Sequence, residues 1–151
     1  MSVPAGAVPE RRIADLRAAA GEQLPPPLVD LVSHTAAPFL QAVFDIEIPR
    51  MAFQRQCLIG DAAFAARPHA AAGSAKAAED GYRLACAIRA AHGDVLVALT
   101  QWESAQLNLG RSVLARTREA GDRSQFHGTW MVGDPLPFGL YEVGDSIVTP
   151  A

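Results

Sequence analysis

The sequence has little of what marks metal sites, disulfide scaffolds, nucleic-acid binders and membrane spans. It has only two cysteines and four histidines, with no C-x-x-C pair and no zinc-ligand spacing, so no metal site is predicted. The formal net charge of -3 argues against nucleic acid or an anionic membrane as a partner. No apolar run approaches the roughly 18 residues that span a bilayer. The first residues also lack the basic-then-apolar order of a signal peptide.

Cys57 and Cys86 are therefore predicted to be buried free thiols of a protein in the reducing cytoplasm. Half of the 151 residues are hydrophobic and 19% are charged, which is typical of one globular domain. The densest basic cluster is Arg111, Arg116 and Arg118, within a predicted helix, and we expect it to be a solvated face.

Periodicity divides the chain into helices and two strands. Helical spacing predicts helices at 9–20, ending before Gly21, and at 28–36, 74–91 and 95–120, the last capped by Asp94, with one more short helix through 126 and an irregular tail. Alternation predicts a half-buried strand at 41–49, and apolar residues predict a strand at 53–59.

Two strands are too few for a stable sheet, which needs at least three. Either neighbouring strands are missing or the fold is mostly helical, and we favour missing strands. Four apolar side chains should then face an incomplete core and leave an uncovered apolar patch or sheet edge: Ile46, Ile48, Leu58 and Ile59.

The loop between the second strand and the helix at 74–91 carries the chemistry. Gly60 permits a tight turn, and Asp61 at the rim of the sheet can accept hydrogen bonds from a polyol. Free amides at the helix start, near Gly73, Ser74 and Ala75, suit an anion or an electron-rich oxygen. Gly-Asp after a strand also occurs as an ordinary turn. Arg67 alone would be a surface charge, and His69 alone a polar loop residue.

The whole stretch CLIGDAAFAARPHAAAGSAKAAEDGYRLACAI resembles the flavin-binding "GD" motif of FAD-dependent aromatic hydroxylases, the para-hydroxybenzoate hydroxylase class. The flanking IPRMAF and QWESAQLNLGR extend the likeness over about 25–145. The resemblance implies that Asp61, after Gly60, binds the ribityl chain of FAD, and that Pro68 lies beside the flavin ring. It also implies that Gly73, Ser74 and Ala75 face the pyrimidine side of that ring.

Many relatives have Asn where this chain has Ala75, so this position can contact the flavin only through its backbone amide. His69 or Arg67 would orient an ionised substrate near the flavin. Asp80, further along the helix, is expected to take no part in flavin binding. No catalytic residue is firmly assigned, and no metal is implied.

The family's N-terminal fingerprint, G-x-G-x-x-G after a strand, is absent, as is its second Asp-Gly segment. The chain therefore resembles only the C-terminal portion of such an enzyme. The fold class implied is α/β, or α+β for the fragment: the last part of a Rossmann-like FAD-binding fold, with one or two strands followed by long helices.

The expected domains are the end of the substrate-binding domain at 1–50, the C-terminal part of the FAD-binding domain at 51–121, and a helix and tail at 122–151. The function implied is hydroxylation of an electron-rich aromatic or N-heteroaromatic ring with FAD, NAD(P)H and O2. The chain alone is expected to be inactive.

The alternatives are an inactive truncated product and a helical interaction module that complements a separate N-terminal FAD-binding chain. The expected partners are a small aromatic substrate, the N-terminal half of the same enzyme and a second copy in a homodimer.

Overall fold

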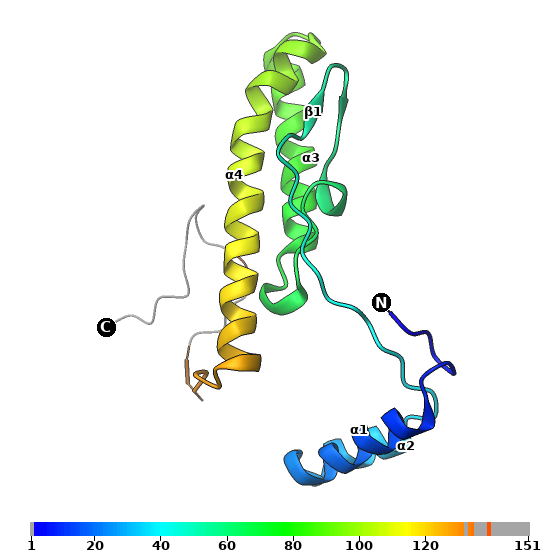
Figure 1. Cartoon of the computed structure of the whole chain (residues 1–151). Coiled ribbons are helices and arrows are strands. Elements are labelled where there is room, and N and C mark those ends of the chain that lie inside the picture. The colour runs from blue at the N-terminus through cyan, green and yellow to red at the C-terminus, as the bar shows by residue number, and fades with distance from the viewer. Residues whose placement is uncertain (1, 132, 135–138, 140–151) are drawn as a thin grey trace. The chain divides into compact units, whose positions relative to one another are not determined.

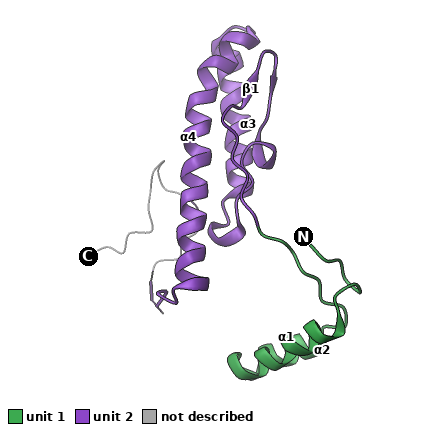
Figure 2. Cartoon of the chain, viewed as in Figure 1, with its two compact units in different colours: residues 1–43 green, residues 44–151 purple. Residues whose placement is uncertain are grey.

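The computed structural model of the chain describes residues 2–131, 133, 134 and 139 (Figure 1). These residues form two compact units, 1–43 and 44–151, each described here by itself (Figure 2). Most of the predicted tail lies outside the described residues. No helix in the described part of the chain is long and apolar enough to cross a bilayer.

The first unit is a pair of helices, α1 (Glu10–Gln23) and α2 (Pro26–His34), which pack against each other. The prediction that α1 ends before Gly21 is wrong, because the helix continues to Gln23 and ends where Pro25 and Pro26 follow. Proline at the start of α2 costs no hydrogen bond, since the first amides of a helix have no intrahelical acceptor.

The predicted strand at 41–49 is also wrong, since residues 41–49 belong to no strand. Alternating side chains stabilise a strand only where a neighbouring strand accepts its ladder of hydrogen bonds. Ile46 N–H instead donates to Ala65 O at 2.8 Å, a single tie to a loop. Ile46 remains exposed, as predicted for a face without cover, whereas Ile48 is partly buried against the core.

The predicted strand at 53–59 is a short antiparallel hairpin instead, β1 (Ala52–Phe53) paired with β2 (Gln56–Cys57). The chain reverses at Gln54, whose φ of 57° lies in the left-handed region. Leu58 N–H donates to Met51 O at 2.8 Å, which extends the pairing by one bond. Leu58 and Ile59 are exposed, as predicted for an uncovered edge.

Two long helices make the body of the second unit, α3 (Gly73–Ala90) and α4 (Val95–Gly121), which pack side by side in opposite directions (Figure 1). Both match their predicted ranges closely. The Asp94 carboxylate accepts hydrogen bonds from Leu96 N–H and Val97 N–H, which confirms it as the N-cap. After α4 the chain makes a π-helical turn, η3 (Asp122–Phe126), at the predicted short helix.

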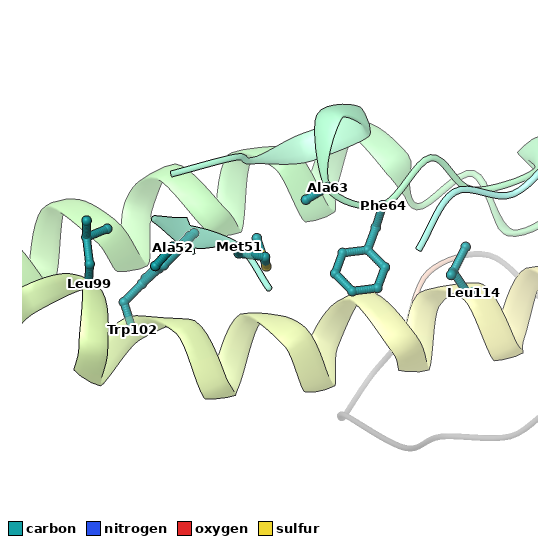
Figure 3. Packing of buried hydrophobic residues seen from close by; sticks show 7 residues of the cluster. All are labelled: Met51, Ala52, Ala63, Phe64, Leu99, Trp102 and Leu114. Atoms are coloured by element: carbon teal, nitrogen blue, oxygen red, sulfur yellow. The ribbon is translucent and has the colours of Figure 1, made fainter. Parts of the chain in front are cut away.

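The core lies between α4, the hairpin and the loop that precedes α3 (Figure 3). Its buried side chains are Met51, Ala52, Ala63, Phe64, Leu99, Trp102 and Leu114. The Phe64 ring lies flat on α4 at Gly110, where a Cβ would come within 2.4 Å of the ring. Glycine at this position therefore lets the loop approach the helix.

Charged side chains of α4 also bind residues 45–52, the segment that leads into β1. Glu103 Oε1 accepts hydrogen bonds from Met51 N–H at 2.7 Å and Ala52 N–H at 2.8 Å. The prediction that the arginine cluster is a solvated face holds for Arg111 and Arg118, which are exposed and form ion pairs with Glu47 and Asp45 of the segment before β1. It is wrong for Arg116, which is buried.

Candidate functional site

The turn after the hairpin depends on Gly60. This residue is buried and has a φ of 58°, in the region that favours glycine. A Cβ added there would lie 3.1 Å from the Cβ of Ala77, so α3 packs directly against the turn. Gly60 O accepts hydrogen bonds from Ala63 N–H and Phe64 N–H, which winds the turn into η1 (Gly60–Ala62).

Asp61 follows Gly60 in η1 and is exposed to solvent. Asp61 lines an open hollow of about 660 Å³ between the turn and the start of α3. The hollow is lined by Asp61, Ala66, Arg67, Pro68, Ala71, Ala72, Gly73, Ser74 and Ala77. Six of these nine are alanine, glycine or proline, so the backbone of the loop and the helix start is accessible from the hollow.

The second part of the loop is a 3-10 turn, η2 (Pro68–Ala70), which begins at Pro68 and ends at Ala71 in a left-handed conformation. Ala70 is buried, and its carbonyl accepts a hydrogen bond from Gly139 N–H at 2.7 Å. This bond fixes the loop after Pro68, which lines the hollow.

α3 points its N-terminus at the hollow. Helix geometry leaves the N–H groups of Gly73, Ser74 and Ala75 without intrahelical acceptors, and the first bond of the helix runs from Lys76 N–H to Ala72 O. A helix of this length carries about half a positive charge at its N-terminus. The hollow therefore combines a carboxylate acceptor on one side with amide donors and positive potential on the other.

Arg67 adds a cation to this wall and is held from behind by Asp45. The Asp45 carboxylate accepts a hydrogen bond from Arg67 N–H at 3.3 Å and one from Arg118 Nε at 2.8 Å. Arg67 Nε also lies 3.3 Å from Asp45 Oδ2, an ion pair without hydrogen-bond alignment. Burial raises the pKa of Asp45, but the bonds from Arg118 and Arg67 outweigh it and the net shift is downward. Asp45 is therefore ionised at neutral pH and fixes Arg67.

A buried ion pair lies behind the turn, between Lys76 Nζ and Asp80 Oδ2 at 2.6 Å. Asp80 Oδ2 also accepts a hydrogen bond from Gly60 N–H at 2.8 Å. Asp80 was expected to take no part in the site, yet it is fully buried and bonded to the glycine that sets the turn. The spacing of Lys76 and Asp80, four residues apart on one helix, was the available signal for this pair.

The predicted site residues fall into two groups. The structure brings Asp61, Pro68, Gly73 and Ser74 together around the hollow, with Gly60 beneath them. Ala75 and His69 are not among the lining residues. The His69 ring lies against Gly121 of α4, where an added Cβ would be 3.0 Å from the imidazole. The roles predicted for these residues in cofactor binding stay predictions.

Neither cysteine fits a reactive site. Cys57 and Cys86 are free and half-buried rather than fully buried as predicted. Burial, together with the charge of Asp80, raises the pKa of Cys57, so its thiol is protonated at neutral pH and is a weak nucleophile. Within the described residues no group of three His, Cys, Asp or Glu side chains is placed to hold a metal ion.

Two of the known proteins that the chain matches are of the same kind. Over 131 residues the chain is 41% identical to 2,6-dihydroxypyridine 3-monooxygenase from Paenarthrobacter nicotinovorans, covering 85% of this chain and 33% of that protein. The solved 2,6-dihydroxypyridine-3-hydroxylase from Arthrobacter nicotinovorans matches with a TM-score of 0.81 and 36% identity, over 98% of this chain and 37% of that chain. No family profile matches the chain.

The chain thus spans about a third of the length of each relative. The predicted resemblance is confirmed: the chain is similar to a fragment of a hydroxylase of this kind. The fold prediction is confirmed as well: an α+β piece, mostly helical with a two-stranded sheet, matches a C-terminal fragment of the hydroxylase fold.

Proposed function

Because the chain matches a fragment of an FAD-dependent hydroxylase, we propose that it is the C-terminal, flavin-contacting portion of an NAD(P)H-dependent monooxygenase. The substrate class is an electron-rich aromatic or N-heteroaromatic ring. The observation that supports this most is the hollow, where Asp61, Pro68 and the start of α3 meet. All three were assigned to the flavin on the sequence motif alone.

The lining of the hollow fits the ribityl and ring portions of FAD. The exposed Asp61 carboxylate is an acceptor for ribityl hydroxyls. The amides of Gly73 and Ser74 would donate to carbonyl oxygens at the pyrimidine edge of the ring, and the helix end would favour negative charge there. Pro68 and the lining alanines offer an apolar surface for the ring. The bound flavin would accept a hydride from NAD(P)H and activate O2.

Arg67 is the better candidate to orient an ionised ring substrate, in preference to His69. Arg67 lines the hollow, while the His69 imidazole packs against Gly121. Ion pairs with Asp45 and Asp122 hold Arg67 in place, so little conformational freedom would be lost when an anion binds.

The uncovered sheet edge favours a second candidate, in which the chain complements a separate N-terminal FAD-binding chain. Ile46, Leu58 and Ile59 are each about two-fifths exposed, next to a two-stranded hairpin. Further strands beside β2 would cover these side chains and pair the open edge. In this arrangement the partner supplies the ADP-binding surface, and a cytoplasmic homodimer of the assembled enzyme remains a prediction.

Flavin titration tests the proposal. The full chain alone should bind FAD weakly, because the hollow offers only ribityl and ring contacts. Mixed with the part of the Paenarthrobacter monooxygenase that this chain does not cover, it should restore flavin binding and give a yellow complex. A colourless mixture with no flavin absorbance refutes the proposed function. Sub-micromolar FAD affinity of the chain alone refutes its dependence on a missing N-terminal portion.

Asp61→Ala in the complex isolates the carboxylate. Loss of one hydrogen bond to a charged acceptor, about 1.5–3 kcal/mol, corresponds to a roughly tenfold to hundredfold loss of FAD affinity. Asp80→Ala is unsuitable as a control because it strips Gly60 and Lys76 of their partner. Glu79→Ala on the same helix is suitable, since Glu79 pairs only with exposed Arg83 in the described contacts. Equal losses in both variants refute the role of Asp61.

A further inference from the structure

The Lys76–Asp80 pair is buried in a fragment that has few buried charges. Lys76 is 3% exposed and Asp80 is 0% exposed. Taking two charges out of water is costly, and apolar residues of similar volume often stabilise a fold as well or better. The contribution of this pair therefore has to be sought in contacts that apolar residues cannot make.

Asp80 makes one such contact. Its Oδ2 accepts a hydrogen bond from Gly60 N–H at 2.8 Å, and that amide is buried at a left-handed turn. The backbone carbonyl of Asp80 accepts a hydrogen bond from Trp102 Nε1 at 3.0 Å, which ties this point of α3 to α4. Asp80 thus connects Gly60 to both long helices.

Lys76 supports the other end of the same turn. Its ammonium lies 4.8 Å from the centroid of the Phe64 ring, a cation–π distance. Phe64 in turn lies flat on α4 at Gly110. The segment between Gly60 and Phe64, which contains Asp61, is therefore fixed at both ends by one buried ion pair.

We propose that Asp80 is a positioning residue that holds Gly60 in its left-handed conformation and so aims the Asp61 carboxylate into the hollow. Lys76 is its counter-charge, with Nζ 2.6 Å from Asp80 Oδ2. This inference rests on the proposed function where it concerns the flavin. The conformation of the turn is a property of the chain alone.

Two double variants with the same charge separate positioning from simple burial. Lys76→Met with Asp80→Asn removes both charges but leaves an amide oxygen to accept from Gly60 N–H. Lys76→Met with Asp80→Leu also removes both charges but leaves Gly60 N–H without an acceptor. Urea unfolding of the full chain gives the global stability of each, and amide hydrogen exchange reports on Gly60 itself. FAD titration of each variant in the complex gives the functional readout.

The exchange rates are compared after correction for any difference in the free energy of unfolding without urea. Gly60 N–H should then exchange about tenfold faster or more in the leucine variant than in the asparagine variant, because its hydrogen bond is gone. In the complex, the leucine variant should lose FAD affinity while the asparagine variant retains most of it. A leucine variant that fails to fold while the asparagine variant folds also supports the proposal.

Equal protection of Gly60 N–H in both variants overturns the proposal. Unfolding of both variants also overturns it, because the proposal requires that the neutral amide oxygen of asparagine can replace the carboxylate as acceptor. If the unmodified complex binds no FAD, the proposed function fails, and Gly60 exchange still decides whether Asp80 sets the turn.

Discussion

Substitution of Gly110 by alanine should destabilise the second unit, although alanine is the better helix former. Gly110 lies inside α4 and is buried. Its ideal Cβ would lie 2.4–2.6 Å from three ring atoms of Phe64, well inside contact distance. The ring is 2% exposed and has Lys76 over its face, so it cannot swing out to solvent.

The size of the effect follows from two opposing terms. Glycine to alanine in a helix interior gains about 1 kcal/mol in propensity. Overpacking a filled core costs about 1–3 kcal/mol. Gly81 of α3 is the matched control, because nothing lies within 4 Å of its ideal Cβ and only the favourable term applies. The two variants should therefore differ in free energy of unfolding by about 1–3 kcal/mol, with Gly81→Ala the more stable.

Urea unfolding followed by far-ultraviolet circular dichroism measures both variants. Phe64→Leu should relieve the clash, so the double variant with Gly110→Ala should be less destabilised than the sum of the single changes. If Gly110→Ala is as stable as Gly81→Ala, the loop does not lie on α4 as described and the packing argument is refuted.

Three further changes test other contacts. Asp94→Ala should cost about 1 kcal/mol of unfolding free energy, since it removes the acceptor of Leu96 and Val97 N–H; no change in a urea titration would contradict the cap. The pKa of Asp45 is lower in the folded than in the unfolded chain, so its ionised carboxylate stabilises the fold. This contribution is fully present above the unfolded-state pKa, near 3.9, and is lost as the pH falls through the folded-state pKa. Asp45→Asn should thus be less stable at pH 7, and the gap should close in acid unfolding experiments. Leu58→Lys should reduce self-association of the isolated chain in sedimentation velocity; an unmodified chain that stays monomeric at high concentration contradicts the uncovered edge.

The long helices were predictable because their signals are local. α4 has an apolar stripe that includes Leu99, Trp102 and Val113, all buried, and an aspartate cap at its start. The end of α1 was missed, since a glycine inside a helix costs only about 1 kcal/mol and Gly21 is tolerated there.

The strands were not predictable, because a strand depends on neighbours that the local pattern does not contain. Alternation at 41–49 describes side chains that suit a sheet, but pairing partners decide whether a ladder forms. At 53–59 the polar residues Gln54 and Arg55 were read as part of a strand, and they form the turn of the hairpin.

The grouping of the loop residues was predictable where they are adjacent in the motif, while their roles toward a flavin stay predictions. Asp61, Pro68, Gly73 and Ser74 line one hollow because the loop is short and closes on the start of α3. The support beneath the hollow was missed: the spacing of Lys76 and Asp80 indicates a pair, but an ionisable residue is ordinarily expected in solvent, so nothing local signals that the pair is buried. On α3 the side chains that face the core are Lys76, Asp80 and the partly buried Leu84. Two of these three are charged, so a search for apolar residues at helical spacing does not find them.

The contacts that α4 makes with the segment before β1 set the timing of folding during synthesis. Asp45 leaves the ribosome 73 residues ahead of Arg118, and Met51 leaves 52 residues ahead of Glu103. At about 5–20 residues per second, the partner of Asp45 arrives roughly 4–15 s later. Until then Met51 and Ile48, which lie in or against the core that α4 completes, remain exposed to solvent. Nascent chains of this protein should therefore engage chaperones in that interval, and slower translation of the codons for α4 should lower the yield of folded protein.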